Sequence, residues 1–561
     1  MTHDAPTFED LRLNAAREFA QTMIVIDDEA SQSSEVAMPD PISDLRRPSR
    51  VTRARGKNAK ASSEKKAAAR PSTHALNAKS LIDKAMDLGL ICSVLRPRKG
   101  ENFRGRVVGA AQRADIVCLD WEIYDDSGES ATKIICDIVK EDAKENGKLR
   151  LIAIYTGDIT NNIILEKIFK AIPKRIRDDH EFKKEPLKIV SKNGLKIVCL
   201  FKAHGVKLQP PRSDNQVKED ELPERLQSEF AMLSEGLLSN VALATIASIR
   251  KSTHHVLSKF TGQMDGPYFH HRALLESSDD AEEYAVDVVL SELKSAVDKQ
   301  EVANAHAGHA AIKARIEEIA GDSNTLELHY VNDGISDVFD LKVDVLVKMI
   351  TDGLSLVLKN DRPPNSPKTK IFETELSSLF SRNREAAHSE MHQFAALTGI
   401  RAYPGSYLYK SGQLLPKLGL GTIIQGKNKT YLLCLQASCD SVRIRVAADF
   451  LFVPLEETVG KPDHVVPISY SATEFDYIGL TVSSESYAAA KSIGFSACSE
   501  TGTVNASRIG KRPGLFFVSS NGVTYRWIAD LKRRRALRTV QRLGQAMGRL
   551  GFDEFEPYRQ E

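Results

Sequence analysis

Charged and hydroxyl-bearing residues follow four apolar runs in the first third of the sequence. Asp27 and Asp28 come directly after MIVI, and Asp120 comes directly after DIVCL. Thr156 follows LRLIAIY, and Lys202 follows KIVCLF. If the ends of these runs meet, three carboxylates, a hydroxyl and an ammonium group surround one pocket. Three carboxylates together need a cation, and oxygen ligands with room for water suit Mg²⁺.

This set of residue types suits the transfer of a phosphoryl group to a side chain. A carboxylate can attack phosphorus as a covalent nucleophile and form an aspartyl phosphate. The new phosphoryl oxygens then need donors, which the Lys202 ammonium and the Thr156 hydroxyl can supply. A lone Asp-Asp pair at a strand end is more often a turn or a helix cap, so the inference depends on the whole set.

The elements that must position these residues are strands of an α/β sheet. Short apolar runs alternate with helical patterns, which is typical of a parallel sheet. Strands are predicted at 23–26, 90–95, 115–119, 149–155 and 196–201, with helices at about 76–88, 103–112, 129–145 and 160–171. The near-continuous apolar runs indicate that helices cover both faces. We expect a doubly wound, five-stranded parallel sheet whose functional residues gather at the carboxyl ends of the strands.

Four motifs, in chain order, resemble those of the receiver domain of bacterial two-component response regulators. MIVIDDEA is similar to the family's first-strand motif, and IVCLDWEIYDDSG is similar to its phosphoacceptor motif. IAIYTG resembles the motif with the switch hydroxyl, and CLFKAH resembles the lysine motif. The resemblance covers roughly residues 20–235. It implies a flavodoxin-like fold and a Mg²⁺-dependent phosphorylation by a partner histidine kinase.

The resemblance also implies a role for each polar residue. Asp120 would be the phosphoacceptor, and Gly128 stands eight positions later, where the family often has glycine. The implied metal ligands are Asp27, Asp28, Asp120 and the backbone carbonyl of Glu122, and the implied phosphoryl-binding residues are Thr156 and Lys202.

The sequence departs from the family's pattern at several positions. Ala203 follows the lysine where the family usually has proline, and Tyr124 replaces a proline in the loop after the phosphoacceptor. Cys199 stands where an aromatic switch residue is usual. A segment at about 31–73 follows the acid pair, and its stretch 46–70 carries ten Lys or Arg against one Glu. We expect that segment to be a disordered basic insertion.

Three regions are predicted along the chain. Residues 1–235 form the receiver-like domain, in which 173–194 adds a helix or an edge strand. Residues 236–398 are mainly helical, and residues 399–561 form a β-rich α+β domain that ends in a basic helix. Asn521-Gly522 between two strand-like runs predicts a hairpin. Whether the last two regions are one domain or two stays open.

Composition excludes several classes of protein. The chain has 561 residues, a formal net charge of +2 and 27% charged residues, as expected of a soluble globular protein. No apolar run approaches the roughly 20 residues of a membrane helix. The seven cysteines form no C-x-x-C pair, which favours reduced thiols and a cytoplasmic location. His388 and His392 share a helix face, but no third ligand is evident, so we expect no zinc site there.

Several biological roles stay open. The leading hypothesis is a phosphoacceptor that is not itself an enzyme and takes part in a phosphorelay, with a downstream effector as a further partner. The divergent motifs and unfamiliar C-terminal region resemble those of Detocs-type antiviral two-component systems, where such a protein can act as a phosphate sink. A transcriptional or nucleic-acid-binding regulator is less favoured, because no folded DNA reader is evident. The third hypothesis is a receiver that is never phosphorylated and serves as an interaction module.

Overall fold

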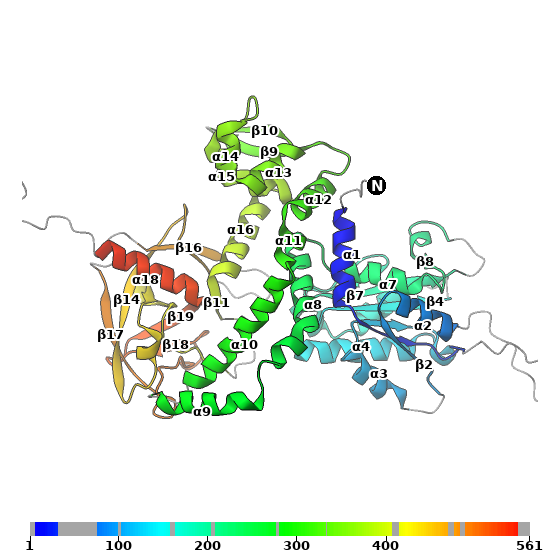
Figure 1. Ribbon diagram of the computed structural model, residues 1–561, viewed down its shortest axis with the longest axis horizontal. Helices are drawn as coiled ribbons and strands as arrows, with labels where there is room; N and C mark the ends of the chain where they lie inside the picture. The colour runs from blue at the N-terminus through cyan, green and yellow to red at the C-terminus, as the bar shows by residue number, and fades with distance from the viewer. Residues whose placement is uncertain are drawn as a thin grey trace, which may run out of the picture. The chain divides into compact units, whose positions relative to one another are not determined.

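The computed structural model describes residues 6–31, 76–98, 102–157, 163–203, 208–275, 280–332, 334–404, 406, 414–468, 476–482 and 489–547. They belong to two compact units (Figure 1). The first comprises Met1–Gln263 with Asp287–Glu318, and the second comprises Met264–Val286 with Ile319–Glu561. The predicted basic insertion lies outside the described residues, except for Ser31. The predicted boundaries at 235 and 398 stay predictions beside this division into two units.

An eight-stranded sheet is the centre of the first unit. Its strands are β1 Thr22–Ile26, β2 Ile91–Leu95, β3 Ile116–Leu119, β4 Arg150–Thr156, β5 Lys183–Lys184, β6 Lys188–Val190, β7 Leu195–Lys202 and β8 Gln216–Val217. The order is β2-β1-β3-β4-β7-β6-β5, and β8 pairs with β7. Neighbours from β2 to β7 run parallel, as predicted. The predicted number of five strands is wrong, because β5, β6 and β8 extend the sheet beyond β7.

The extension lies in the segment for which the sequence left a helix or an edge strand open. Both are present: helix α6 (Lys174–Asp179) is followed by β5 and β6, which pair antiparallel with each other. Strand β6 also pairs antiparallel with β7 and buries Ile189 completely. An uncovered β7 would expose a row of unpaired backbone groups, and the hairpin covers that edge.

Helices cover both faces of this sheet, as the sequence predicts (Figure 1). On one face lie α1 Phe8–Phe19, α2 Ala78–Asp87, α7 Leu222–Ala231 and α8 Leu237–Leu257; on the other lie α3 Phe103–Ala111, α4 Glu129–Lys144 and α5 Ile164–Ala171. Successive strand residues point to opposite faces. In β1, Met23 and Val25 join the core beneath α1 and α2, whereas Ile24 and Ile26 join the core beneath α3 and α4. From β1 the chain runs outward to β2 and then returns to β3 on the other side, so the strand order reverses between β1 and β3, the position at which open α/β sheets generally bind ligands.

The middle of the chain is mainly helical, with one hairpin that was not predicted. Its helices are α9 Asp265–Leu274, α10 Asp280–Lys299, α11 Val302–Ala307, α12 His309–Ala320, α13 Val343–Lys348, α14 Leu354–Asn360, α15 Thr369–Glu375 and α16 Arg384–Gly399. Strands β9 (Thr325–Asn332) and β10 (Ile335–Lys342) pair antiparallel over their full length.

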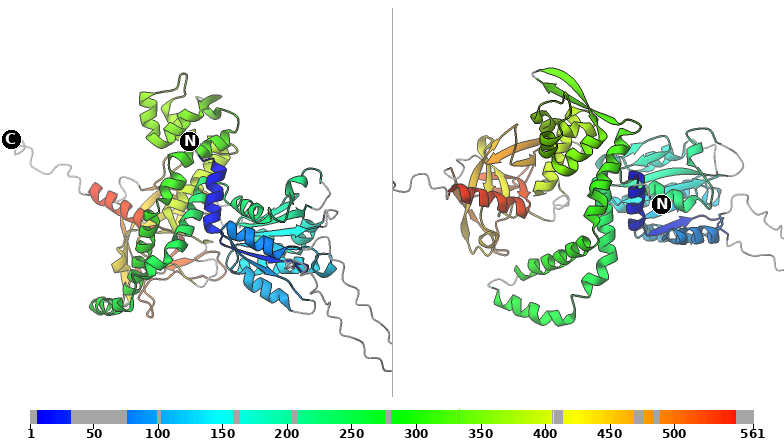
Figure 2. Two further views of the ribbon diagram at one scale, coloured as in Figure 1. Left: turned by 45° about the vertical axis from the view of Figure 1, so that its right-hand side comes forward. Right: turned by 45° about the horizontal axis from the view of Figure 1, so that its top comes forward.

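A nine-stranded sheet forms the β-rich region of the second unit (Figure 2). Its strands are β11 Ile400–Ala402, β12 Thr422–Gln425, β13 Tyr431–Cys434, β14 Ala447–Glu457, β15 His464–Pro467, β16 Tyr477–Val482, β17 Lys491–Ser496, β18 Phe516–Val518 and β19 Thr524–Leu531. Strands β18 and β19 form the hairpin predicted from Asn521-Gly522. The basic helix α18 (Arg533–Met547) packs on the sheet through Ala536 and Leu543, while Leu537 of the same helix is 43% exposed.

Candidate functional site

The carboxyl ends of β1, β3, β4 and β7 meet at one edge of the first sheet. Ile26 lies beside Leu119, and Leu119 lies beside Ile154. Asp27 and Asp120 each follow directly after a residue of this row, and the Asp120 amide donates to the Ile26 carbonyl at 2.8 Å. The parallel register therefore brings side chains together that lie more than 90 positions apart in the sequence.

Lys202 joins the acidic residues from the end of β7. Its Nζ lies 2.7 Å from Asp120 Oδ2 and 3.2 Å from Asp27 Oδ2. The side chains of Lys202 and Asp27 are each 3% exposed, and that of Asp120 is 11% exposed. One buried ammonium group is thus shared by two carboxylates, and of the two Asp120 is the one that solvent reaches. This is the arrangement expected if Asp120 must meet a reactant while Asp27 stays inside.

The pKa values of Asp27 and Lys202 shift for different reasons. Burial, offset in part by Lys202, raises the pKa of Asp27 to about 6. Burial alone would lower the pKa of Lys202, but Asp120 and Asp27 together raise it above its ordinary value. The two shifts differ because Lys202 gains from two carboxylates, whereas among the described residues Asp27 shares the cation beside it with Asp120. Lys202 therefore stays charged at neutral pH, while Asp27 can take a proton in mildly acidic solution.

Asp28 presents one oxygen that the described part of the chain does not use. Its Oδ2 accepts a hydrogen bond from the Tyr124 amide at 3.0 Å, and its backbone carbonyl accepts one from Arg96 Nε at 3.0 Å. Its Oδ1 is buried and has no hydrogen-bond partner among the described residues. Burial raises the pKa of Asp28. A buried carboxylate oxygen without a donor is costly, and a cation would relieve that cost.

These residues fit a hydrated Mg²⁺ better than an all-protein metal cage. Mg²⁺ usually keeps several waters and takes one or two carboxylates. Asp27 and Asp28 would hold it, with Asp120 beside them. Within the described ranges, no three carboxylate, imidazole or thiol side chains gather as closely as a closed metal site requires.

The loop after Asp120 holds the carboxylate of Asp120 in place. The Glu122 amide donates to Asp120 Oδ1 at 3.2 Å, and Glu122 Oε2 accepts from the Ser127 amide at 3.2 Å. Glu122 therefore lies next to the site, and metal binding by its carbonyl oxygen stays a prediction. Tyr124, where the family has proline, adopts a left-handed backbone with φ of 60°.

Gly128 is required by the packing of this loop. It has a φ of 77°, and a Cβ atom there would lie 2.1 Å from the ring of Trp121. Trp121, directly after Asp120, is fully buried. Only glycine accommodates both the left-handed backbone and the close approach of the indole. The glycine eight positions after the acceptor thus has a steric cause in this chain.

Thr156 ends β4 and is fully buried, beside Phe201 of β7. The strand register puts it one position before the level of Lys202, so hydroxyl and ammonium lie on neighbouring strand ends. The preceding residue, Tyr155, is one that sequence reasoning missed. Its ring centroid lies 5.5 Å from Lys202 Nζ, and its hydroxyl donates to the Val217 carbonyl of β8 at 3.1 Å. The only signal in the sequence was an aromatic residue next to the threonine.

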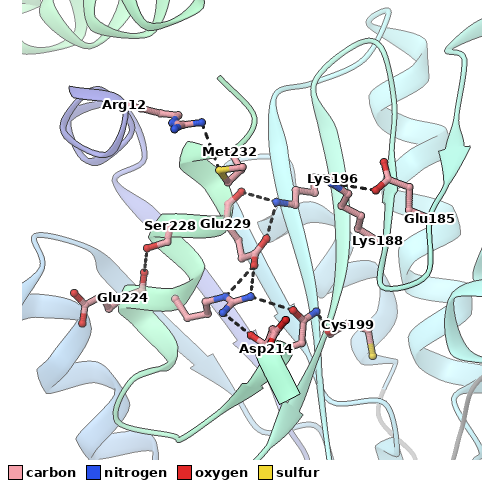
Figure 3. Close-up of polar contacts among 12 residues, drawn as sticks. Arg12, Glu185, Lys188, Lys196, Cys199, Asp214, Glu224, Ser228, Glu229 and Met232 are labelled. Carbon is pink, nitrogen blue, oxygen red and sulfur yellow. Dashed lines mark hydrogen bonds and ion pairs between the residues drawn. The ribbon is translucent and has the colours of Figure 1, made fainter. Parts of the chain in front are cut away.

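A second group of contacts that the sequence did not reveal fixes β7 against α7 (Figure 3). Lys196 of β7 is buried and lies 2.6 Å from Glu229 of α7. Arg225 Nη2 lies 2.7 Å from the same carboxylate, and a second bond from this nitrogen reaches Asn215 Oδ1 at 3.1 Å. Asn215 Nδ2 in turn donates to the Cys199 carbonyl at 2.8 Å. The strand that ends in Lys202 is therefore held by polar contacts along its length.

The structure shows what surrounds the two residues that depart from the family's pattern near Lys202. Cys199, in place of the aromatic switch residue, is 3% exposed and belongs to the core beneath α3, α4 and α5. Ala203, in place of proline, donates its amide to the Val217 carbonyl at 3.1 Å, a bond that proline could not make. The strand that ends in Lys202 is therefore connected to β8 through the amide of Ala203.

Comparison with known proteins agrees with this geometry. Residues 19–207 match the response receiver domain family. No curated protein and no solved structure gives a match. None of the described helices is long and apolar enough to cross a membrane. The N-terminal part of the chain therefore contains a response receiver domain, and the candidate site lies inside the matched residues.

Proposed function

We propose that this protein accepts a phosphoryl group on Asp120 from a phosphohistidine of a partner histidine kinase. The observation that carries the proposal is the shared ammonium of Lys202, 2.7 Å from Asp120 and 3.2 Å from Asp27 at the carboxyl edge of a receiver sheet. The partly exposed Asp120 is the acceptor, and the buried Asp27 balances the cation. The protein is a phosphorelay component in this proposal and not an enzyme.

The chemistry follows from these positions. A carboxylate oxygen of Asp120 attacks phosphorus, a P–O bond forms, and the P–N bond to the donor imidazole breaks with its electron pair passing to that nitrogen. Lys202, already hydrogen-bonded to Asp120, is placed to donate to a phosphoryl oxygen. The Thr156 hydroxyl is proposed as the second donor. A Mg²⁺ ion held by Asp27 and Asp28 would supply positive charge for the phosphoryl oxygens.

The proposal is tested with the full chain, Mg²⁺ and a small acyl phosphate donor. Wild type should gain one hydroxylamine-labile phosphate, and Asp120→Asn should gain none. Asp83→Asn, a change on the exposed side of α2, is the matched control and should behave like wild type. Lys202→Gln should lose most of the phosphorylation. Equal labelling of wild type and Asp120→Asn would reject the acceptor and favour the receiver as an interaction module.

The biological role is proposed at a coarser level. A receiver joined to a second unit with a different fold suits a phosphate sink or a regulator. We propose an antiviral two-component system as its setting. The observation behind it is that Asp27, Asp120 and Lys202 lie together within the described receiver residues. Phosphate transfer from the cognate kinase should compete with transfer to an effector receiver. A kinase that phosphorylates the effector equally with and without this protein would refute the sink.

A further inference from the structure

A small pocket in the second unit contains a histidine whose ring nitrogens are unused. The pocket has a volume of about 60 Å³ and lies where α16, β15, β19 and α18 come together. His464 and Arg535 line it, with Asp463, Gly399 and Leu531. His464 is 4% exposed, and neither Nδ1 nor Nε2 has a hydrogen-bond partner among the described residues. Buried polar groups nearly always have a partner, so these nitrogens point to a ligand.

The charges around the pocket determine whether a ligand there is positively or negatively charged. The carboxylate of Asp463 is already occupied, because its two oxygens lie 2.6 Å and 2.7 Å from the Arg542 guanidinium. Its Oδ2 also accepts from the Val482 amide at 2.9 Å. Arg535 donates to the backbone carbonyl of Asp463, and in the described part of the chain no carboxylate is paired with it. The pocket therefore keeps one positive charge that its own residues do not balance.

The protonation state of the His464 imidazole further restricts which ligands fit the pocket. Burial, together with the guanidinium groups of Arg535 and Arg542, lowers the pKa of His464 to about 4. A neutral imidazole has one N–H donor and one acceptor nitrogen. A fitting ligand needs negative oxygens for Arg535 and for the N–H, and a hydroxyl for the other ring nitrogen. Inorganic phosphate at neutral pH has both, and so does the monoanion of a phosphomonoester, whereas sulfate and simple carboxylates lack the hydroxyl.

The size of the pocket agrees with such an ion. One water molecule needs roughly 10–15 Å³ of space for its centre. The pocket offers about 60 Å³ of such space, which holds roughly four to six water-sized groups. Phosphate has five heavy atoms. We propose that this pocket binds phosphate, either the free ion or the end of a phosphomonoester, with Arg535 and the His464 N–H donating to its oxygens. This site is separate from the receiver and goes beyond the proposed function.

Calorimetric titration of the full chain with inorganic phosphate tests the proposal. Saturable binding is expected, and Arg535→Gln should weaken it by at least ~10-fold because a charged hydrogen-bond donor is lost. His464→Gln should also weaken it. Arg538→Gln, an exposed residue of the same helix, is the matched control and should bind like wild type. Binding that persists in both Arg535→Gln and His464→Gln would overturn the assignment.

Two further arms identify the ion and guard against misfolded variants. Sulfate should bind roughly 3- to 10-fold more weakly than phosphate, because one hydrogen bond is missing. Equal affinity for sulfate would reject phosphate. Glycerol 3-phosphate distinguishes the sources: its binding identifies a phosphomonoester, and its exclusion identifies the free ion. In wild type labelled with ¹⁵N-histidine, phosphate should shift the His464 ring resonances, which the His464→Gln spectrum assigns. If phosphate leaves the His464 ring resonances unchanged, the pocket contains only water and the proposal is overturned. This result does not depend on the folding of any variant.

Discussion

Replacing Asp27 with asparagine should stabilise the receiver domain at pH 8, although it removes one partner of a buried ion pair. Burial raises the pKa of Asp27 from 3.8 to about 6 even with Lys202 at 3.2 Å. A shift of roughly 2 units corresponds to about 3 kcal/mol, at 1.36 kcal/mol per unit. Because Lys202 keeps Asp120 as a partner, the variant leaves no cation without a carboxylate. We expect a gain of about 1 to 3 kcal/mol in the free energy of unfolding at pH 8.

The sign of the pH dependence follows from linkage. The folded state of the wild type binds the Asp27 proton more tightly than the unfolded chain does, so this proton contributes stability below pH 3.8. That contribution is lost as the pH rises from about 4 through 6, and above pH 6 the charged carboxylate costs the full amount. The asparagine side chain of the variant cannot ionise, so the effect of the substitution should be near zero at pH 4 and should grow to its full size by pH 7.

The assay uses urea unfolding followed by the fluorescence of Trp121. The chain has two tryptophans, so Trp527→Phe is placed in every protein to make the signal specific to the receiver domain. Metal-free buffer keeps cations away from the acid pair. Asp83→Asn serves as the control and should change stability by less than about 0.5 kcal/mol at every pH. A variant that is less stable than wild type at pH 8, or a difference that does not change between pH 4 and 8, would refute the reasoning.

Three other outcomes follow from the same structure. Gly128→Ala should destabilise the receiver domain by about 3 kcal/mol, because residue 128 has a positive φ and faces the indole ring of Trp121. Gly89 has a similar φ but open space around it, so Gly89→Ala should cost only about 1 kcal/mol. The urea midpoints of the two variants test this difference. Arg150→Met should cost about 3 to 5 kcal/mol, because it leaves Asp142 buried without its cation, and the double change with Asp142→Leu should recover most of that loss in the same assay. Mg²⁺ affinity, measured by titration against intrinsic fluorescence, should fall as the pH drops through 6, because a proton on Asp27 competes with the metal; equal affinity at pH 5 and pH 8 would contradict this.

The elements of the fold that could be predicted are those whose sequence pattern has one physical cause. Strands buried on both faces are apolar over most of their length, so β1, β3, β4 and β7 can be predicted from apolar runs, and the polar residues after these runs indicate the site. Strands β5 and β8 have two residues each, and β5 consists of two lysines, so no periodicity could reveal them. The hairpin β9–β10 could have been found, because VNDGIS contains an Asp-Gly pair, which favours tight hairpins.

The polar contacts of the site had a weaker signal. That Lys202 lies close to Asp120 follows from the strand order and could be expected. That Lys202 also contacts Asp27, and lies over the ring of Tyr155, depends on side-chain directions that spacing does not determine. The buried pair of Lys196 and Glu229 had no signal at all, because a lysine inside a strand ordinarily indicates an exposed position.

The double use of Lys202 explains why an acid pair stands at the end of β1. If Lys202 turns from its carboxylates to a phosphoryl group on Asp120, Asp27 loses its cation at a position that is 3% exposed. Removing one partner of a buried ion pair costs about 3 to 5 kcal/mol, which is comparable to a large share of a domain's stability. Phosphorylation would therefore be unfavourable unless a second cation reaches Asp27. The Oδ1 of Asp28, on the adjacent residue, has no hydrogen-bond partner among the described residues and would provide a ligand for such a cation. In the proposed reaction the acid pair would thus offset the departure of Lys202, and a Mg²⁺ ion would balance the buried Asp27 as well as the charge of the phosphate.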